Sequence, residues 1–259
     1  NNYKLMDLFA GCGGLSLGFE NKGFKTVFVN EVNHDALSTY LQNRHHKFNG
    51  MPFNKISDLH SKDINELNIK SLIKLKSDLK NFSDINFVEE KKTGFTNIDV
   101  VAGGPPCQGF SGIGHRRSYN VDKQNLPSNH LYERMCFIIK NIKPRIFLFE
   151  NVRGLLNAKW YQDHPEKIWP DVLKAFKSIP NYIVKWELVF AKDYGIPQNR
   201  PRVLLVGIRK DIVNSSNIVS NFKENDSALK SGFIPQPLKN NNPPDLEDLL
   251  GDLIDKNIE

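Results

Sequence analysis

Residues 3–23, YKLMDLFAGCGGLSLGFENKG, begin with a short apolar run, pass through a glycine-rich turn and continue with a helical pattern that ends at Gly23. A second apolar run, KTVFVNE (residues 25–31), follows at once and leads into a helix with Asn33 as its expected N-cap. The order strand, glycine turn, helix, strand is typical of the start of a parallel, doubly wound α/β sheet.

Four further apolar runs predict the remaining strands, and the stretches between them have the spacing of amphipathic helices. The strands are expected at residues 97–103, 145–151, 182–191 and 202–209, the last two antiparallel to each other, and the helices at 64–82, 129–143 and 167–179. After residue 211 the chain becomes rich in Asn, Ser and Pro. We therefore expect one α/β domain over residues 1–211, followed by a polar excursion and a short C-terminal helix over residues 212–259.

The composition limits the classes of protein to which the chain can belong. The 259 residues include 35 Lys and Arg against 29 Asp and Glu, a formal net charge of +6, which favours a polyanionic partner such as nucleic acid. The sequence has no run of eighteen apolar residues and no charged-then-apolar leader, so it supports neither a membrane span nor a secretory signal. Its three cysteines lack the spacing of a zinc site or a disulfide framework, which favours a reducing, cytoplasmic compartment.

The stretch GGPPCQGFSG (residues 103–112) holds a cysteine directly after two glycines and two prolines. Proline fixes φ and pushes the preceding residue out of the helical region, so the stretch is expected to be a stiff, extended loop. Because it follows a predicted buried strand, Cys107 is expected at the carboxyl edge of the sheet, where open α/β sheets bind ligands.

Two later stretches are expected to bring charged groups to the same edge. FLFENVRG ends an apolar strand with Glu150 and Asn151, and we expect the apolar neighbours to raise the pKa of Glu150. YGIPQNRPR supplies Gln198, Arg200 and Arg202 just before a strand. The alternation of the two arginines places them on one face, and arginine suits phosphates and planar acceptors.

The glycine turn and the acid after the second strand predict a nucleoside cofactor. Gly11, Gly13 and Gly14 lie between strand and helix, where the backbone comes close to a ligand. Glu31 ends the second strand, where a carboxylate binds ribose hydroxyls. Asp63 has two interpretations: an acid near the end of a third strand at this edge, or a helix N-cap in a capping-box-like pattern.

Taken together, these stretches resemble the DNA cytosine-5 methyltransferases. Six signatures of that family stand in order between Asp7 and Arg202: DLFAGxGG, an acid after strand two, an acid followed by Ile, GGPPCQxFS, ENV and QxRxR. The resemblance implies a Rossmann-like S-adenosylmethionine-dependent methyltransferase fold, with a mostly parallel doubly wound sheet, helices on both faces and an antiparallel last strand. It also implies DNA as the substrate, and a role as the modification enzyme of a bacterial restriction–modification system.

The resemblance further implies roles for individual residues. S-adenosyl-L-methionine would contact Phe9, Gly11, Gly13, Glu31, Asp63, Ile64, Pro106 and Leu131. The catalytic residues would be Cys107 as covalent nucleophile toward a flipped cytosine, Glu150 as proton donor at the ring, Arg202 at the cytosine carbonyl, Arg200 near the nucleophile or a phosphate, and Asn151 as a brace for the cysteine loop. Gln108, Ser111, Arg116 and Gln198 would contact the substrate.

The chain departs from the family's pattern after the arginine motif. It continues for 57 residues beyond Arg202, in which we find neither a target-recognition region nor the family's late motifs. We therefore expect either a fragment or one subunit of a split enzyme, with weak DNA binding and little turnover on its own. A tRNA cytosine-5 methyltransferase and a catalytically silent subunit that binds S-adenosylmethionine are the alternative interpretations.

Overall fold

The computed structural model describes residues 3–86, 97–106, 127–161, 165–215, 222–238 and 250–251. Within these residues, the main sheet has seven strands in the order β5-β2-β1-β6-β7-β9-β8. The strands of this sheet are β1 (Tyr3–Leu8), β2 (Phe24–Asn30), β5 (His60–Ser61), β6 (Val100–Gly103), β7 (Ile146–Val152), β8 (Tyr182–Phe190) and β9 (Pro201–Arg209). A separate hairpin joins β3 (Lys47–Phe48) to β4 (Met51–Pro52).

The strand directions confirm the predicted sheet. Strands β5, β2, β1, β6 and β7 pair in parallel, whereas β9 runs antiparallel to both β7 and β8. Strand order reverses between β1 and β6, because the chain moves outward from β1 to β2 and β5 and then returns to β6. In open α/β sheets a ligand binds at such a reversal, in the crevice outside the carboxyl ends of the strands.

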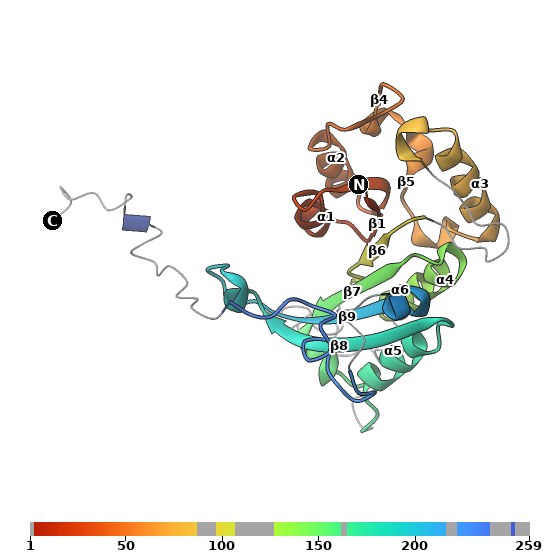
Figure 1. Cartoon of the computed structure of the whole chain (residues 1–259). Coiled ribbons are helices and arrows are strands. Elements are labelled where there is room, and N and C mark those ends of the chain that lie inside the picture. The colour runs from red at the N-terminus through yellow and green to blue at the C-terminus, as the bar shows by residue number, and fades with distance from the viewer. Residues whose placement is uncertain are drawn as a thin grey trace.

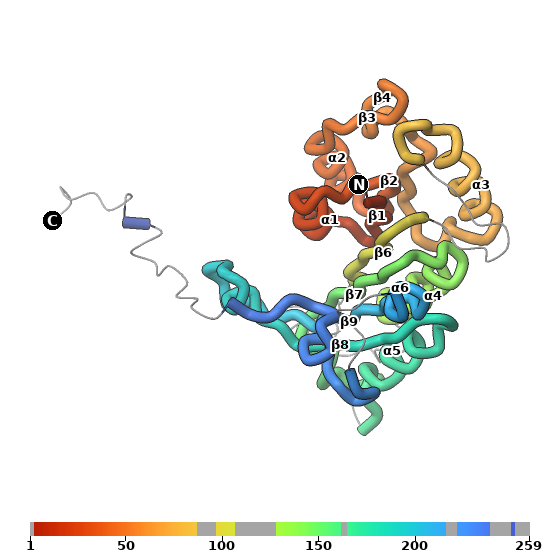
Figure 2. Tube along the Cα trace, in the orientation of Figure 1, coloured from red at the N-terminus to blue at the C-terminus, as the bar shows by residue number. Residues whose placement is uncertain are grey.

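Helices cover both faces of the sheet (Figures 1 and 2). Helices α3 (Ile69–Lys80), α4 (Leu131–Ile142) and α5 (Ile168–Lys177) contribute to the largest apolar core, and α2 (His34–Gln42) packs near the β5 end. Helix α1 (Gly14–Glu20) packs on β1 and β6, while α6 (Lys210–Ser215) and residues 222–238 pack on β9. None of the helices in the described ranges is both long and apolar enough to cross a lipid bilayer.

Strand β7 contributes to the apolar cores on both faces of the sheet, because its side chains alternate between the two faces. Phe147 and Phe149 are buried in the largest core, and Ile146 and Leu148 contact the cores on the other face. A strand covered on both faces has to be apolar on both, which is why this stretch reads as a continuous apolar run.

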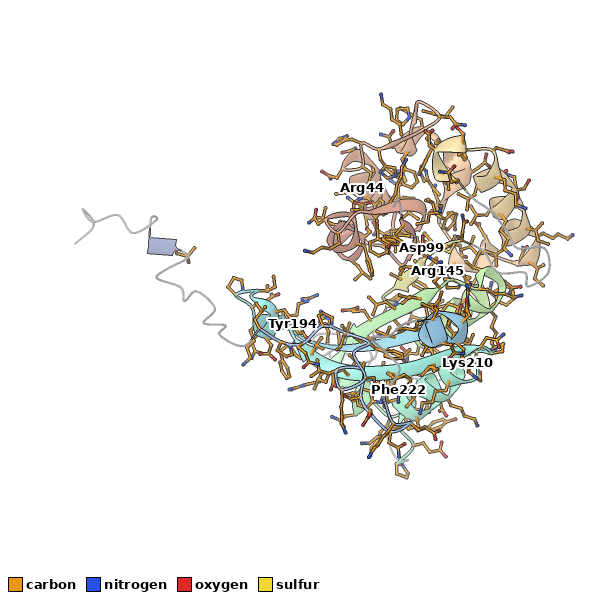
Figure 3. The ribbon with its side chains drawn as sticks, in the orientation of Figure 1. Arg44, Asp99, Arg145, Tyr194, Lys210 and Phe222 are labelled. Carbon is orange, nitrogen blue, oxygen red and sulfur yellow. The ribbon has the colours of Figure 1, made fainter. Side chains whose placement is uncertain are left out.

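Two segments differ from the expectation. The helix expected over residues 64–82 begins only at Ile69, because residues 64–66 form a 3₁₀ turn and Asn68 caps the helix. Residues 222–238, expected to be a polar surface excursion, bury Ala228, Phe233 and Ile234 against β9. The apolar residues of this segment are not spaced with the period of a helix or a strand, so the sequence pattern did not predict their burial. Figure 3 shows Phe222, at the start of this segment, over the strands of the lower part of the sheet.

Gly207 of β9 lies directly opposite Phe147 of β7, and a Cβ atom at residue 207 would overlap the ring of Phe147. Because Phe147 is fully buried, its ring has no free space to move into. We expect Gly207→Ala to lower the free energy of unfolding by about 1–3 kcal/mol, measured by denaturant unfolding.

Gly18→Ala is the matched control for this substitution. Gly18 lies in α1, and a Cβ atom there would meet nothing within 4 Å. The control should raise the free energy of unfolding by about 0.5–1 kcal/mol, since alanine favours a helix over glycine. Equal stability of the two variants would contradict the tight packing of β9 on Phe147.

Candidate active site

A cavity of about 390 Å³ opens at the carboxyl ends of β1, β6 and β7, beside the reversal in strand order. The glycine turn after β1, the loop after β6 and the end of β7 all contribute to its wall. The lining residues are Asp7, Phe9, Ala10, Gly14, Leu15, Gly104, Glu150 and Arg200. The cavity therefore brings together three of the stretches that the sequence placed at this edge.

The turn after β1 has an unusual backbone. Phe9 and Gly11 both have φ of +55° and Gly13 has φ of +90°. The amide of Ala10 donates to the carbonyl of Asn30 at 3.0 Å, and the amide of Gly13 donates to the carbonyl of Ala10 at 2.9 Å. A Cβ atom at residue 13 would lie 2.6 Å from Arg44 and from Tyr40, so only glycine fits there.

The side chain of Arg44 packs behind this turn, a contact that the sequence analysis did not predict. Its guanidinium donates to the carbonyl of Gly13 at 2.9 Å and to the hydroxyl of Ser16 at 3.1 Å, and its Nε lies 2.8 Å from a carboxylate oxygen of Glu20. The residue is 5% exposed, and its guanidinium lies over the ring of Tyr40. Because a buried charge is tolerated only when it is paired, Arg44 and Glu20 fix α1 against the turn.

Glu31 connects the glycine turn to the start of α2. One carboxylate oxygen accepts from the amide of Gly11 at 2.7 Å and the other from the amide of Asn33 at 2.8 Å. Each oxygen keeps a second lone pair. The predicted ribose contact is thus compatible with the structure, and the carboxylate has a second task in holding the turn.

Asp7 was not among the predicted site residues. It is fully buried at the end of β1 and lines the cavity, and neither carboxylate oxygen has a hydrogen-bond partner among the described residues. Burial raises the pKa of Asp7 to about 7, against the opposing effects of the Ser16 hydroxyl and the Arg44 guanidinium. An acid at the end of an apolar strand was the available signal, since the same signal drew attention to Glu150.

Glu150 and Arg202 form an ion pair across the adjacent strands β7 and β9. The Nε of Arg202 lies 2.5 Å from Oε1 of Glu150, and their side chains are 20% and 28% exposed. A Cβ atom at residue 104 would lie 2.7 Å from Oε2 of Glu150, so Gly104 lets the loop after β6 pass close to this carboxylate. The strand end opens into the cavity, so Glu150 is partly exposed and has a cationic partner as well as the apolar lining residues Phe9, Ala10 and Leu15 nearby.

Asn151 is buried beside this pair and holds the loop after β6. Its side-chain amide donates to the carbonyl of Pro105 at 3.2 Å, and its side-chain oxygen accepts from the amide of Val152 at 2.9 Å. This contact matches the expected brace of the proline segment. Cys107, Gln108, Ser111 and Arg116 lie outside the described residues.

The other predicted residues lie at different distances from the cavity. Arg200 lines it, whereas Gln198 is exposed and does not. Pro106 and Leu131, the first residue of α4, are half-buried, and neither lines the cavity. Among the described residues, no group of three His, Cys, Asp or Glu side chains could hold a metal ion.

Asp63 and Ile64 lie near the far end of this edge. Asp63 follows β5 and caps the 3₁₀ turn Ile64–Glu66, accepting from the amide of Asn65 at 2.8 Å, so the N-cap interpretation is confirmed, while its contact with a ligand stays a prediction. Ile64 is buried in the main core.

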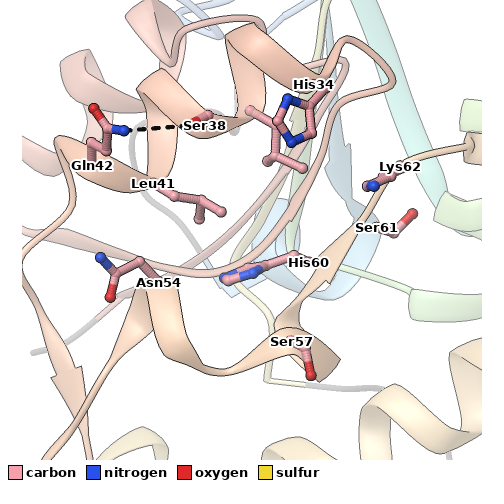
Figure 4. Close-up of a pocket in the computed structure, with 10 residues that line it drawn as sticks. His34, Ser38, Leu41, Gln42, Asn54, Ser57, His60, Ser61 and Lys62 are labelled. Atoms are coloured by element: carbon pink, nitrogen blue, oxygen red, sulfur yellow. Dashed lines mark hydrogen bonds between the residues drawn. The ribbon is translucent and has the colours of Figure 1, made fainter.

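A second cavity, of about 440 Å³, lies between α2 and β5 and shares no lining residue with the first. Figure 4 shows His60, Ser61 and Lys62 along one side of it and Leu41 on the other.

Comparisons with known proteins agree with this geometry. The family model described as C-5 cytosine-specific DNA methylase matches residues 3–75 and 69–258. Type II methyltransferase M.FnuDI of Fusobacterium nucleatum is 35% identical over 214 residues, which are 83% of this chain and 49% of that protein. Type II methyltransferase M.XorII of Xanthomonas oryzae pv. oryzae is 35% identical over 209 residues, 80% of this chain and 41% of that protein. The chain thus spans about half the length of the curated relatives it matches.

A solved structure supports the same assignment. A candidate DNA modification methyltransferase encoded within a prophage of E. coli is 28% identical, with a TM-score of 0.55 over 82% of this chain and 48% of that one. Because the family model covers almost the whole sequence and the matched motifs meet at one edge of the sheet, the chain belongs to the C-5 cytosine-specific DNA methylases.

Proposed function

We propose that the chain carries the catalytic machinery of a DNA (cytosine-5-)-methyltransferase, which transfers a methyl group from S-adenosylmethionine to carbon 5 of a cytosine flipped out of DNA. The observation that carries this proposal is the Glu150–Arg202 pair beside the proline segment that Asn151 holds. That segment leads directly to Cys107 in the sequence. The relatives named Type II methyltransferases support a role in a restriction–modification system, acting on DNA in the bacterial cytoplasm.

The charge of the cavity suits S-adenosylmethionine. When bound, this cofactor supplies a methyl group on a cationic sulfonium. The buried, unpartnered carboxyl of Asp7 suits a ligand that brings positive charge, such as an ammonium or sulfonium group. The turn at Phe9, Gly11 and Gly13 lets the backbone come close to the ligand, and Glu31 offers acceptors for ribose hydroxyls.

Carbon 5 of cytosine is a poor nucleophile, and the residues around the base pocket activate it. Addition of the Cys107 thiolate to carbon 6 makes the ring enamine-like, so carbon 5 can accept the methyl group. Glu150 provides the proton for N3 as negative charge enters the ring, and Arg202 holds the cytosine carbonyl. Loss of the carbon 5 proton then releases Cys107. These atoms are out of reach in a stacked duplex, so the base has to be flipped.

A second polypeptide, or a further segment of a longer one, would supply target recognition. Leu17 of α1 and Tyr3 at the amino end of β1 are 50% and 40% exposed, and the ring of Tyr3 packs on Phe24 of the apolar core that α1 forms on β1 and β6. We propose that this apolar surface at α1 contacts the complementing part.

The nucleophile is tested with DNA that contains 5-fluorocytosine, because fluorine at carbon 5 cannot leave as a proton does and the covalent adduct is trapped. We expect an adduct with the wild-type protein, in the presence of the complementing part where the chain alone binds DNA too weakly. Cys107→Ser should abolish it, as judged by denaturing electrophoresis and mass spectrometry.

Cys136→Ala is the matched control, since Cys136 is buried in α4 and burial raises the pKa of its thiol to about 12. Its adduct should equal that of the wild type. An adduct that persists in Cys107→Ser would exclude Cys107 as the nucleophile.

Glu150→Gln should lower kcat about 100-fold or more in the complete enzyme, because a proton donor in the transition state typically contributes at least that factor. Glu187→Gln on β8 is the control: Glu187 and Glu150 both pair with Leu204 of β9, but Glu187 does not line the cavity. Steady-state methylation of DNA should separate the two variants. Equal loss in both would remove Glu150 from the mechanism.

The affinity for a cationic cofactor should depend on the ionisation of Asp7. Its raised pKa, about 7 against an ordinary 3.8, means that Asp7 is mostly protonated at pH 6 and mostly ionised at pH 8. A positively charged ligand binds the ionised form, so affinity for S-adenosylhomocysteine, which carries the ammonium group, should rise about tenfold from pH 6 to pH 8. Titration calorimetry at both pH values measures this.

Asp7→Asn should remove this pH dependence. It should also make the ligand-free protein more stable at pH 8. The pKa of Asp7 is higher in the native state than in the unfolded chain, so ionisation of Asp7 lowers native stability as the pH rises through that pKa, and asparagine does not ionise. Asp99→Asn is the control, because Asp99 pairs with Arg145 at the opposite edge of the sheet (Figure 3). A pH dependence that survives Asp7→Asn would show that another group causes it.

A further inference from the structure

Asn30 is the last residue of β2, and it makes contacts that none of the functional assignments above uses. The residue is 1% exposed. Its side-chain amide donates to the carbonyl of Lys62 at 2.9 Å, to the hydroxyl of Ser61 at 3.0 Å and to the carbonyl of Ser61 at 3.3 Å. Two amide hydrogens are thus shared among three acceptors, all on the segment that leads from β5 to Asp63.

The backbone of Asn30 joins the same region to the glycine turn. Its carbonyl accepts from the amide of Ala10 at 3.0 Å, and the next residue, Glu31, accepts from Gly11 at 2.7 Å. Three parts of the predicted nucleoside site, namely the turn, Glu31 and the segment ending at Asp63, therefore meet at one buried asparagine.

The segment from β5 to Asp63 has few backbone contacts at this point, although the next residue, Ile64, is buried in the main core. β5 is two residues long and, among the described strands, it pairs with β2 alone. Its other side borders the cavity of about 440 Å³ in Figure 4, with Ser61 and Lys62 in the wall. The amide of Glu31 donates to the carbonyl of Ser61 at 3.0 Å, and the Asn30 side chain supplies the remaining cross-link.

We propose that Asn30 is a positioning residue that sets the spacing between Glu31 and Asp63, and thereby determines the affinity for the nucleoside part of the cofactor. This inference rests on the proposed function, because it takes these two acids as the ribose and adenine contacts. Asn30 does not touch the ligand; it acts through the two segments that it joins.

The test compares two ligands by titration calorimetry on the purified chain. S-adenosylhomocysteine has a nucleoside part and an amino-acid part, whereas 5′-methylthioadenosine has the nucleoside part alone. Asn30→Ala should weaken both ligands by the same factor, about tenfold, because the lost hydrogen bonds hold only the nucleoside end. Asp7→Asn should weaken S-adenosylhomocysteine and leave 5′-methylthioadenosine unchanged.

Two comparisons separate positioning from a general loss of structure. Asn141→Ala removes an asparagine whose amide donates to the carbonyl of Phe137 at 2.8 Å within α4, and it should change neither affinity. A variant that is partly unfolded lowers the stoichiometry of binding, while a mispositioned site raises the dissociation constant at full stoichiometry. If Asn30→Ala does not fold, Ser61→Ala removes one of the three acceptors and should weaken both ligands about twofold to threefold.

The outcomes distinguish a failure of the proposed function from a failure of the role proposed for Asn30. A wild-type chain that binds neither ligand would overturn the proposed function itself. A wild type that binds both, with an Asn30→Ala or Ser61→Ala variant of equal affinity, would overturn the role of Asn30 alone. Weakening of S-adenosylhomocysteine but not of 5′-methylthioadenosine would also overturn it.

Discussion

The parallel alignment of β1, β6 and β7 is the constraint on which the site depends. It brings the ends of three strands to one edge, so that Asp7, Gly104 and Glu150 line a single cavity although they are far apart in the sequence. β9 then enters from the opposite direction, and its first residues reach the same edge. Arg202 meets Glu150 only because β9 is antiparallel to β7.

Close packing at two glycines keeps this edge open to a ligand. Gly13 leaves room for Arg44 and Tyr40 behind the turn, and Gly104 leaves room for the carboxylate of Glu150. In both places the space that a side chain would need is already filled by a charged or aromatic neighbour. The backbone rather than a side chain therefore forms these parts of the wall, which suits a ligand that must lie close against it.

The sequence predicted the sheet, its strand directions and the edge at which the site lies, because apolar runs and glycine turns are local signals. It predicted Glu31, Glu150 and Asn151 at strand ends, and the structure places them there. Arg44 and the role of Asn30 were not predictable, since each depends on side-chain hydrogen bonds to residues 28 to 32 positions away in the chain. The ion pair of Glu150 with Arg202 was not predicted, because Glu150 was judged from its own strand while Arg202 comes from the next one.

Asp7 and Glu150 line the same cavity but differ in their partners, so the two ends of the cavity differ in charge. Glu150 has the Arg202 guanidinium beside it, whereas Asp7 is fully buried without a hydrogen-bond partner among the described residues. Two titratable groups whose environments differ in this way serve different steps. A positive ligand is stabilised more by an acid without a cation than by one already paired. A cationic group in this cavity would therefore be held best at Asp7, while a neutral planar ring would meet the carboxylate and guanidinium of Glu150 and Arg202. Strand β6 lies between β1 and β7, so the two acids are separated along the sheet although both line one cavity.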